Sequence, residues 1–591
     1  MKIIGIYDGH NSNAALIEDG KILKAVEEER FSRIKNHDGR VLKGPIDSIR
    51  YCLEGQDKID LIAIALEHPE DLYKNAYSSW LKDIDHKKRE SRKSFLLEQK
   101  NILAQKFDLD NGYEVAALPG VTQQNRIDKI KKILEELGLS KVPIQFINHH
   151  LCHNSSAYFT SGKTKGLCLS LDGKGDDLCG MICLANDGEV KEIARVNYLE
   201  SIGHFYSGIT VALGFKAVRH EGKITGLAAY GTPPAELLEK FRQLFKINND
   251  GEIFSELPTN LNIGPYPHTV FGDYLTKIKD LIDGYTREEV AAAAQVLLEE
   301  VVTEWASFWV KKTGEKDLFL SGGVFANVKL NQRILEIDGV NSVYVHPALS
   351  DSGLGVGAAL EAYHNARLAN GTEYTPYALG NIYFGPSFSD DQILCAIKDS
   401  GLKFDQPFEI EKEIAHKLDE GKIVALYNGG LEYGPRSLGA RTVLYHTKDV
   451  KVNDWLNSQL GRTEFMPFAP VTMYEKAKDC YVINEGKDPY YTSKFMTITM
   501  DCKDNMKEMS PAVVHIDGTA RPQLIKREDN PLYYDILNEY FKISGIPSLV
   551  NTSFNMHEEP IVCTPAEAIK AFEQSNLDFI CLGSYLVEKR S

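Results

Sequence analysis

Two stretches of the chain share one pattern of strands and turns: Lys2–Val26, KIIGIYDGHNSNAALIEDGKILKAV, and Gly166–Leu184, GLCLSLDGKGDDLCGMICL. In the first, a polar loop and an Asp-Gly turn separate three apolar segments, which predicts the strands Lys2–Tyr7, Ala14–Glu18 and Lys21–Val26. In the second stretch, Asp-Gly again follows an apolar strand, and a tight turn precedes the next strand. Such an internal repeat predicts two related lobes in an α/β fold.

A strand, a loop with aspartate and glycine, and a returning strand are typical of the phosphate-binding hairpin in actin, sugar kinases and heat-shock ATPases. Two copies of this unit would surround a nucleotide cleft. We therefore expect the N-terminal part of the chain to have the actin-like ATPase (ASKHA) fold with duplicated lobes.

Composition and charge narrow the class of protein. The chain has 591 residues, 43% hydrophobic and 25% charged, as in globular proteins with more than one folding unit. The net charge of -16 disfavours nucleic acid or an anionic membrane as a partner. Asp8 interrupts the first apolar run, and about 18 consecutive apolar residues occur nowhere, so we expect a cytoplasmic protein without a membrane partner. Ten scattered cysteines without a CxxC pair predict buried, reduced thiols.

The organisation along the chain predicts two domains. A capping box at Thr286 and Glu289 begins a long helix that extends to Val310. Loop residues around 376–390 precede a new helix, so we place the boundary near 380 and expect domains at 1–380 and 381–591. The polar segment 68–135 has helical spacing and predicts a solvated helical insertion or lid.

The segment Asn148–His153 predicts a metal site. His149 and His153 stand four residues apart after the apolar strand Pro143–Ile147, so a helix would present both imidazoles on one side. Asp351 follows another strand and precedes an Ala/Gly-rich helix, a position suited to a carboxylate ligand. The histidine pair is also compatible with a structural role, and Asp351 with a helix N-cap.

Glycines and arginines predict sites for anions. Gly322 and Gly323 follow the strand Asp317–Ser321, where a backbone without side chains can approach a phosphate or ribose. Four arginines of the second domain lie beside glycine or small polar residues: Arg436, Arg441, Arg462 and Arg521. Each alone is compatible with a surface salt bridge, but together they favour a polyanion site.

These blocks, in this order, resemble the NodU/CmcH-type O-carbamoyltransferases, a family that includes the tobramycin and nodulation-factor enzymes. The resemblance extends over nearly the whole chain and rests on several blocks: Gly5–Glu18, Glu27–Arg33, Asn148–His153, Leu171–Gly173, Glu221–Gly231, and the motifs SGG, GPRSLGAR, DGTAR and NTSFN.

The resemblance implies a two-step reaction. A C-terminal YrdC-like α/β domain would form carbamoyl adenylate from carbamoyl phosphate and ATP with Mg²⁺. The N-terminal domain, which is similar to the catalytic subunit of tRNA threonylcarbamoyl transfer, would bind iron(II) and pass the carbamoyl group to a hydroxylated small-molecule acceptor. Acceptor-binding residues are expected in 68–135 and 232–285, and the oligomeric state, a homodimer included, stays open.

The resemblance also assigns roles residue by residue. The metal ligands would be His149, His153, Asp172 and Asp351. The catalytic residues would be His10, as general base for the acceptor hydroxyl, with Lys223 and Arg521. The ligands of nucleotide and carbamoyl phosphate would be Gly322, Gly323, Asn327, Arg436, Arg441, Arg462, Arg521, Asn551 and Ser553.

Two other functions remain alternatives at this stage. Both predicted domains resemble parts of the tRNA threonylcarbamoyl pathway, although the acidic chain lacks a basic stripe for RNA. An ATP-gated binding module of the actin-like superfamily would need neither the histidine pair nor the arginine-rich second domain.

Overall fold

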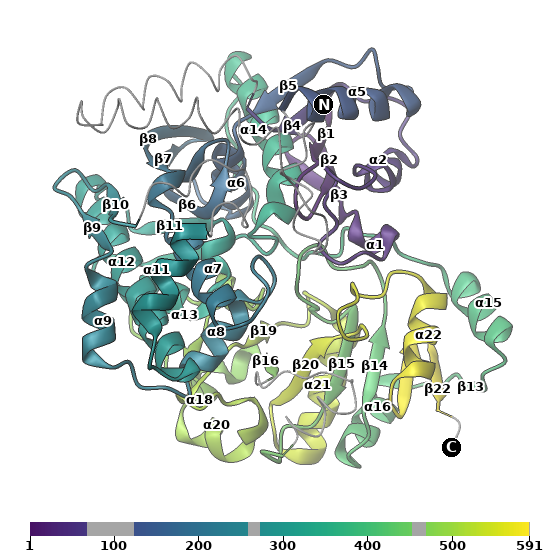
Figure 1. The fold of residues 1–591 in the computed structure, drawn as a ribbon. Coiled ribbons are helices and arrows are strands. Elements are labelled where there is room, and N and C mark those ends of the chain that lie inside the picture. The colour runs from purple at the N-terminus through teal and green to yellow at the C-terminus, as the bar shows by residue number, and fades with distance from the viewer. Residues whose placement is uncertain (68–122, 258–271, 452–467, 590–591) are drawn as a thin grey trace.

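The computed structural model describes residues 1–67, 123–257, 272–451 and 468–589. Most of the predicted insertion 68–135 and part of 232–285 therefore lie outside the described residues. The N-terminal half forms the upper and left parts of the molecule in Figure 1, and the C-terminal half lies below it.

The N-terminal half contains two five-stranded sheets with the same strand order. The first has the order β3-β2-β1-β4-β5 and the second the order β8-β7-β6-β11-β12. In each, three antiparallel strands form a meander, and its first strand pairs in parallel with the fourth strand of the same sheet. The predicted actin-like fold with duplicated lobes is confirmed.

The strand bounds agree closely with the predicted repeat. The first sheet consists of β1 (Lys2–Tyr7), β2 (Asn13–Glu18), β3 (Lys21–Glu27), β4 (Leu61–Ala65) and β5 (Ile144–Ile147). The second consists of β6 (Lys165–Gly175), β7 (Leu178–Asn186), β8 (Glu189–Asn197), β11 (Asp317–Ser321) and β12 (Ser342–Val345). Between β6 and β7, Asp176 (φ 48°) and Asp177 (φ 62°) are both left-handed, as a two-residue I′ hairpin turn requires.

Helix α12 covers the second sheet. It extends over Arg287–Thr313, and the predicted capping box is present, since Thr286 accepts from the Glu289 amide while the Glu289 carboxylate accepts from that of Thr286. Its buried side contributes to the large core shared with β6, β11 and the other helices of this lobe: α7 (Ile202–Ala212), α8 (Glu221–Ala228), α9 (Ala235–Arg242), α11 (Gly272–Ile282) and α13 (Val328–Glu336).

Two helices, α6 (His149–Thr160) and α14 (Leu354–Ala369), pack against each other, and α14 also contacts β1, β2 and β4. Glycines permit this close approach. A Cβ atom at Gly5 would lie 1.8 Å from the Gly355 carbonyl oxygen, and one at Gly357 would lie 1.9 Å from that of Cys152. The contacts of α14 with β1 and with α6 therefore depend on the absence of side chains at Gly5 and Gly357.

The C-terminal half is a second α/β unit around an eight-stranded mixed sheet. Its strands, in spatial order, are β13 (Phe404–Asp405), β22 (Tyr585–Glu588), β21 (Phe579–Leu582), β14 (Val424–Tyr427), β15 (Arg441–Tyr445), β20 (Ser548–Ser553), β16 (Ala469–Met473) and β19 (Gln523–Ile525). The helix pair α16 (Ile410–Asp419) and α21 (Pro531–Ser544) packs in one core cluster, and α15 (Asp390–Ser400) with α22 (Pro565–Gln574) in another. The α/β class is confirmed, whereas the likeness to YrdC and the boundary at 380 stay predictions.

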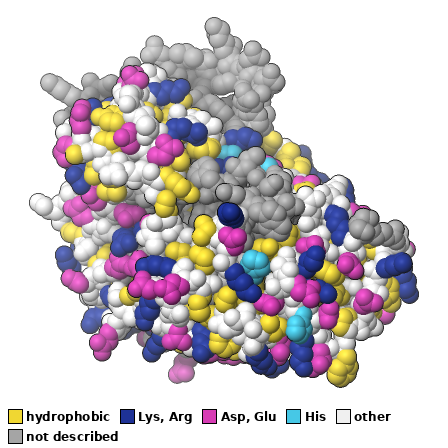
Figure 2. Space-filling model, turned by 90° about the horizontal axis from the view of Figure 1, so that it is seen from below, with side chains coloured by type: hydrophobic (Ala, Val, Ile, Leu, Met, Phe, Trp, Pro, Cys, Tyr) yellow, Lys and Arg dark blue, Asp and Glu magenta, His cyan; other side chains and the backbone are white. Residues whose placement is uncertain are grey.

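One face of the molecule is of mixed charge, and none of the ten cysteines forms a disulfide. Figure 2 shows acidic and basic side chains interspersed on the face viewed from below. All ten cysteines are free, and nine of them are buried. In the part of the chain that the structure describes, no helix combines the length and apolar character needed to cross a bilayer.

We predict that Gly357→Ala destabilises the protein, because its new methyl group would overlap the Cys152 carbonyl on α6. The expected loss is about 1–3 kcal/mol in the free energy of unfolding, measured by urea denaturation. Gly380→Ala is the matched control, since nothing lies within 4 Å of a Cβ atom there. Equal stability of both variants and the parent chain would contradict the proposed glycine contact.

Candidate functional site

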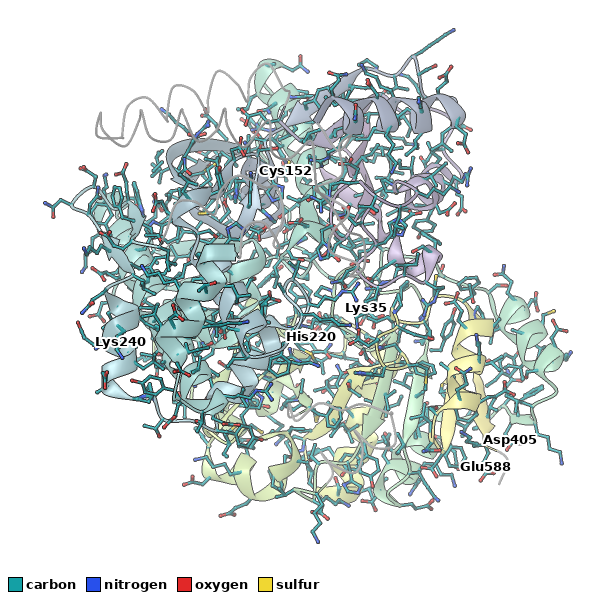
Figure 3. All side chains as sticks on the ribbon, viewed as in Figure 1. Lys35, Cys152, His220, Lys240, Asp405 and Glu588 are labelled. Carbon is teal, nitrogen blue, oxygen red and sulfur yellow. The ribbon has the colours of Figure 1, made fainter. Side chains whose placement is uncertain are left out.

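Helix α6 begins directly after β5 and presents a row of buried histidines. The Asn148 side chain caps the helix by accepting hydrogen bonds from the amides of His150 (2.9 Å) and Leu151 (3.2 Å). His149 is 4% exposed and His153 is fully buried. Cys152, labelled in Figure 3, marks the position of α6 in the N-terminal half.

Two aspartates from distant segments face these histidines. His149 Nε2 lies 3.6 Å from both Asp172 Oδ2 and Asp351 Oδ1. His153 Nε2 lies 3.3 Å from Asp172 Oδ2 and 3.7 Å from Asp351 Oδ1. One donor atom from each of the four residues lies within 4.8 Å of the others. The structure thus brings together all four residues predicted as metal ligands.

Close backbone packing places the carboxylates. Asp172 belongs to β6, and the Gly322-Gly323 turn after β11 lies against it. A Cβ atom at Gly322 (φ 102°) would lie 2.2 Å from the Leu171 carbonyl oxygen, and one at Gly323 would lie 2.9 Å from Asp172 Oδ1. Asp351 begins the short 3-10 helix η5 (Asp351–Gly353), which leads into α14. The two glycines predicted to contact nucleotide therefore also make room for Asp172.

Neighbouring groups hold the four side chains in place. The Tyr7 hydroxyl donates to Asp351 Oδ2 at 2.7 Å, and the Gly173 amide donates to Asp172 Oδ1 at 2.6 Å. Ser321 Oγ lies 3.1 Å from His153 Nδ1. Tyr7 and Ser321 were not predicted as site residues. Their positions at the ends of β1 and β11 were the available signal, because α/β folds place their sites at such strand ends.

The electrostatics of this cluster favour a cation. Burial alone would lower the pKa of His149, but the neighbouring carboxylates of Asp172 and Asp351 raise it above its ordinary value. Burial and the negative charge of Asp172 raise the pKa of Asp351 to about 7. The pKa of Asp172 falls well below its usual range, because its contacts with His149 and His153 outweigh burial.

The geometry and the donor set fit a divalent transition metal. Ligand bonds of about 2.1 Å place the ligand atoms roughly 3–4 Å apart, and the four separations are 3.3–3.7 Å. Two imidazole nitrogens with carboxylate oxygens suit iron(II), manganese or zinc. His149 Nε2 is buried and lacks a hydrogen-bond partner among the described residues, as expected of an atom reserved for a ligand.

The β6–β7 turn packs against His149 of the cluster. Asp176 Oδ2 accepts hydrogen bonds from the amides of His149 (2.8 Å) and Glu67 (2.9 Å), so it joins the turn to α6 and to the segment after β4. A Cβ atom at Gly175 would lie 2.2 Å from His149 Cδ2. Asp176 was not predicted as a site residue, although the Gly-Asp-Asp turn indicated tight backbone geometry there.

The first loop brings His10 and Asp8 to the same lobe. Asn36 Nδ2 lies 3.4 Å from His10 Nε2. Burial lowers the pKa of His10 to about 4, so its imidazole is neutral at pH 7. Asp8 forms a buried ion pair with Arg126 of α5 (Gln123–Glu136), with 2.5 Å between Oδ1 and Nη2. Lys223 lies on α8, with its Nζ 5.9 Å from the centre of the Phe215 ring.

A pair of arginines marks the C-terminal half. Burial lowers the pKa of Arg436 to about 10, and burial together with the charge of Arg436 lowers the pKa of Arg521 well below its usual range. Two partly buried guanidinium groups that repel each other are stabilised by an anion between them. Within the described ranges no ion pair joins either arginine to a carboxylate, and Arg436 Nε has no hydrogen-bond partner.

The other predicted ligands have different surroundings. Arg441 is fully buried, stacks 3.7 Å from the centre of the Tyr427 ring, and donates to the carbonyls of Asn428 (3.1 Å) and Gly429 (3.1 Å). This geometry supports a role in holding the loop, so we leave Arg441 out of the proposed anion site. Arg462 lies outside the described residues.

The predicted amide and hydroxyl ligands are also tied into local contacts. Asn551 Nδ2 donates to the Ser437 carbonyl oxygen (3.1 Å) and to Gln523 Oε1 (2.8 Å). Ser437 directly follows Arg436 in the sequence, and Gln523 lies shortly after Arg521. Ser553 Oγ donates to Asn555 Oδ1 at 2.6 Å. Asn327 caps α13 by accepting from the Leu330 amide at 3.1 Å.

Comparison with known proteins identifies the family. The family model described as "Carbamoyltransferase N-terminus" matches residues 2–360, and "Carbamoyltransferase C-terminus" matches 415–589. The chain belongs to the carbamoyltransferase family. The protein is therefore an enzyme. The region matched by the N-terminal family model contains all four clustered residues, and the region matched by the C-terminal family model contains Arg436 and Arg521.

Relatives match along nearly the whole length of the chain. The nodulation protein NolNO of Sinorhizobium fredii is 30% identical, and the alignment covers 98% of this chain and 79% of NolNO. The protein MJ1058 of Methanocaldococcus jannaschii is 30% identical with full coverage of both chains. The nodulation protein NolO of Bradyrhizobium diazoefficiens is 30% identical over 75% of this chain and 79% of its own.

Similarity to solved structures is lower. The activator of the 2-hydroxyisocaproyl-CoA dehydratase from Clostridium difficile is 12% identical, with a TM-score of 0.33 and coverage of 63% of this chain and 97% of its own. The fold assignment therefore depends on the repeated strand order of the two lobes.

We predict that Gly175→Ala weakens metal binding, because the added methyl group would overlap the His149 ring. Displacement of such a supporting contact typically costs 10- to 100-fold in metal affinity, and titration of the metal-free protein with Co²⁺ or Mn²⁺ would measure it. Gly380→Ala should bind like the parent chain. Unchanged affinity in Gly175→Ala would show that this turn does not support the site.

Proposed function

We propose that this carbamoyltransferase uses ATP and carbamoyl phosphate to transfer a carbamoyl group to a hydroxyl group of a small molecule. The observation that supports the proposal is that two separate clusters of functional side chains occur in one chain. A histidine–aspartate cluster lies in the N-terminal half, and two mutually repelling arginines lie in the C-terminal half.

The first step would occur at Arg436 and Arg521. Hydrolysis of carbamoyl phosphate gives carbamate and phosphate, and a carbamate oxygen then attacks the α-phosphorus of ATP, from which pyrophosphate leaves. The product, carbamoyl adenylate, has AMP as a good leaving group. The two guanidinium groups would bind the anions, as arginine forks do with phosphate and carboxylate, and Mg²⁺ would accompany ATP.

The second step would occur in the N-terminal half. The acceptor hydroxyl attacks the carbamoyl carbon, its proton leaves, and the C–O bond to AMP breaks, which gives the carbamoylated acceptor and AMP. A metal ion, iron(II) by the family resemblance, would be held by His149, His153, Asp172 and Asp351 and would supply Lewis-acid stabilisation of phosphate charge.

His10 is the proposed acceptor of the hydroxyl proton. Its neutral imidazole at pH 7 is in the required protonation state. Lys223, on α8, is proposed as a second catalytic group of this half, and Ser553 and Asn551 as supports of the arginine site.

The two half-reactions should respond to different variants. Arg521→Ala should abolish the carbamoyl-phosphate-dependent release of pyrophosphate from ATP, since one of the two guanidinium groups is lost. His149→Ala should leave that release within about twofold of the parent enzyme while it stops transfer to the acceptor. Pyrophosphate and carbamoylated product are measured separately, with Arg527→Ala, a surface arginine paired with Asp535, as the control. Loss of pyrophosphate release in His149→Ala would contradict this division of labour.

The pH dependence of transfer should reflect His10. The imidazole must be unprotonated to accept a proton, and its pKa is lowered to about 4. With respect to this group, kcat/KM for the acceptor should be constant from pH 6 to 8 and should fall only as the pH decreases through about 4. The difference between the parent profile and that of His10→Asn isolates the contribution of His10. An inflection near pH 6.5 that disappears in His10→Asn would show that His10 is not held neutral by burial.

A further inference from the structure

Buried contacts between the two halves of the chain converge on the segment Glu432–Arg436, which follows β14. Tyr433 is 1% exposed, although it belongs to the C-terminal half, and it packs in the core cluster that contains α14 residues of the N-terminal half. This segment begins the GPRSLGAR motif and ends on Arg436, one of the two arginines of the proposed carbamoyl phosphate site. Lys35 and His220, labelled in Figure 3, lie where the two halves meet.

Tyr433 reaches the loop that carries Asp351. Its hydroxyl donates a hydrogen bond to the carbonyl oxygen of Ser352, the residue after Asp351, and Ser352 is 4% exposed. Two further restraints come from the first lobe, since Asn13 Nδ2 donates to the Asp351 carbonyl at 2.9 Å and the Tyr7 hydroxyl to the Asp351 carboxylate at 2.7 Å. The Asp351 loop is thus held from the C-terminal half as well as from its own lobe.

Gly434 makes the reverse connection. Its amide donates to Glu27 Oε1 at 2.7 Å, and its carbonyl accepts from Arg30 Nη2 at 2.8 Å. Glu27 and Arg30 are 3% and 2% exposed, and both belong to the N-terminal half. Gly434 has φ 109°, a left-handed conformation suited to glycine, and a Cβ atom there would lie 3.1 Å from the Pro347 carbonyl oxygen. Two residues later the chain reaches Arg436.

The segment is also shaped from within. Glu432 Oε1 accepts hydrogen bonds from three backbone amides of the same motif, those of Leu438 (3.0 Å), Ala440 (2.7 Å) and Arg441 (3.0 Å). Buried hydrogen bonds fix both ends of the motif. A displacement of Tyr433 or Gly434 would therefore also displace Arg436.

We propose that the two sites support each other across the interface. Tyr433 of the C-terminal half is a positioning residue for Asp351, and Glu27 with Arg30 of the N-terminal half are positioning residues for Arg436. This inference rests on the proposed function, because it presupposes that a metal binds at Asp351 and carbamoyl phosphate at Arg436. Each half would then have an incomplete site without the other.

Tyr433→Phe tests one direction of this support. The variant keeps the ring and removes the hydroxyl that donates to the Ser352 carbonyl, so the Asp351 loop loses one restraint. Removal of such a supporting contact is expected to weaken Co²⁺ or Mn²⁺ binding about 10-fold or more in the full-length metal-free protein. The absorption spectrum of the Co²⁺ form should change as well, which a general loss of stability would not produce. Tyr540→Phe is the matched control, because the Tyr540 hydroxyl is buried without a hydrogen-bond partner among the described residues.

Arg30→Lys tests the other direction and does not depend on the first variant. Lysine keeps the buried positive charge but lacks the planar fork that contacts both Gly434 and the neighbouring glutamates. The KM for carbamoyl phosphate in pyrophosphate release should rise about 10-fold, with metal affinity within about twofold of the parent. Arg50→Lys, at an exposed arginine paired with Asp47, should match the parent in both measurements.

The outcomes separate this inference from the proposed function. If the parent protein binds no metal and releases no pyrophosphate with carbamoyl phosphate, the proposed function itself is wrong. If the parent does both, and Tyr433→Phe and Arg30→Lys bind metal and carbamoyl phosphate as the parent does, the proposed function stands and the mutual support is refuted. Changes in the two predicted directions, with both controls unchanged, would establish it.

Discussion

Two partly buried carboxylates that face the same pair of buried imidazoles are the constraint on which much of this structure depends. Asp172 and Asp351 repel each other, and burial together with this repulsion raises the pKa of Asp351 to about 7. Such an arrangement needs a cation, and it needs a scaffold that resists the repulsion. The scaffold consists of glycine contacts between α14, α6 and β1, together with donors such as Tyr7 that hold the carboxylates at fixed distances.

Local patterns in the sequence predicted those parts of the fold that depend on neighbouring residues. The strand Lys2–Tyr7 and the capping box at Thr286 occur as predicted, because hydrophobic alternation and cap chemistry act within a few residues. The histidine pair was predictable for the same reason, since helical spacing alone places both rings on one side. The stacking of Arg441 on Tyr427 could not be predicted in this way, because it follows from the pairing of β14 with β15 rather than from its neighbours in the sequence.

The supporting residues of the site escaped prediction for a related reason. Tyr433 is a common core residue and Glu27 is of a type usually found at the surface, and only the packing of one half of the chain against the other shows what they contact. Asp176 is equally inconspicuous, since an aspartate in a tight turn is usually explained by the turn itself. A binding residue carries its chemistry in its type, whereas a positioning residue acquires its role from the tertiary structure.

The repeated strand order places an aspartate at matching positions of the two lobes, with different charged partners. Asp8 directly after β1 and Asp172 in β6 occupy matching places in the two sheets, each followed by glycine. Asp8 is neutralised by Arg126, a cation encoded in the chain, whereas Asp172 faces histidines that would share an exchangeable one. The two matching aspartates thus differ in their counterions: that of the first lobe is a side chain of the protein, whereas that of the second would be the proposed metal ion.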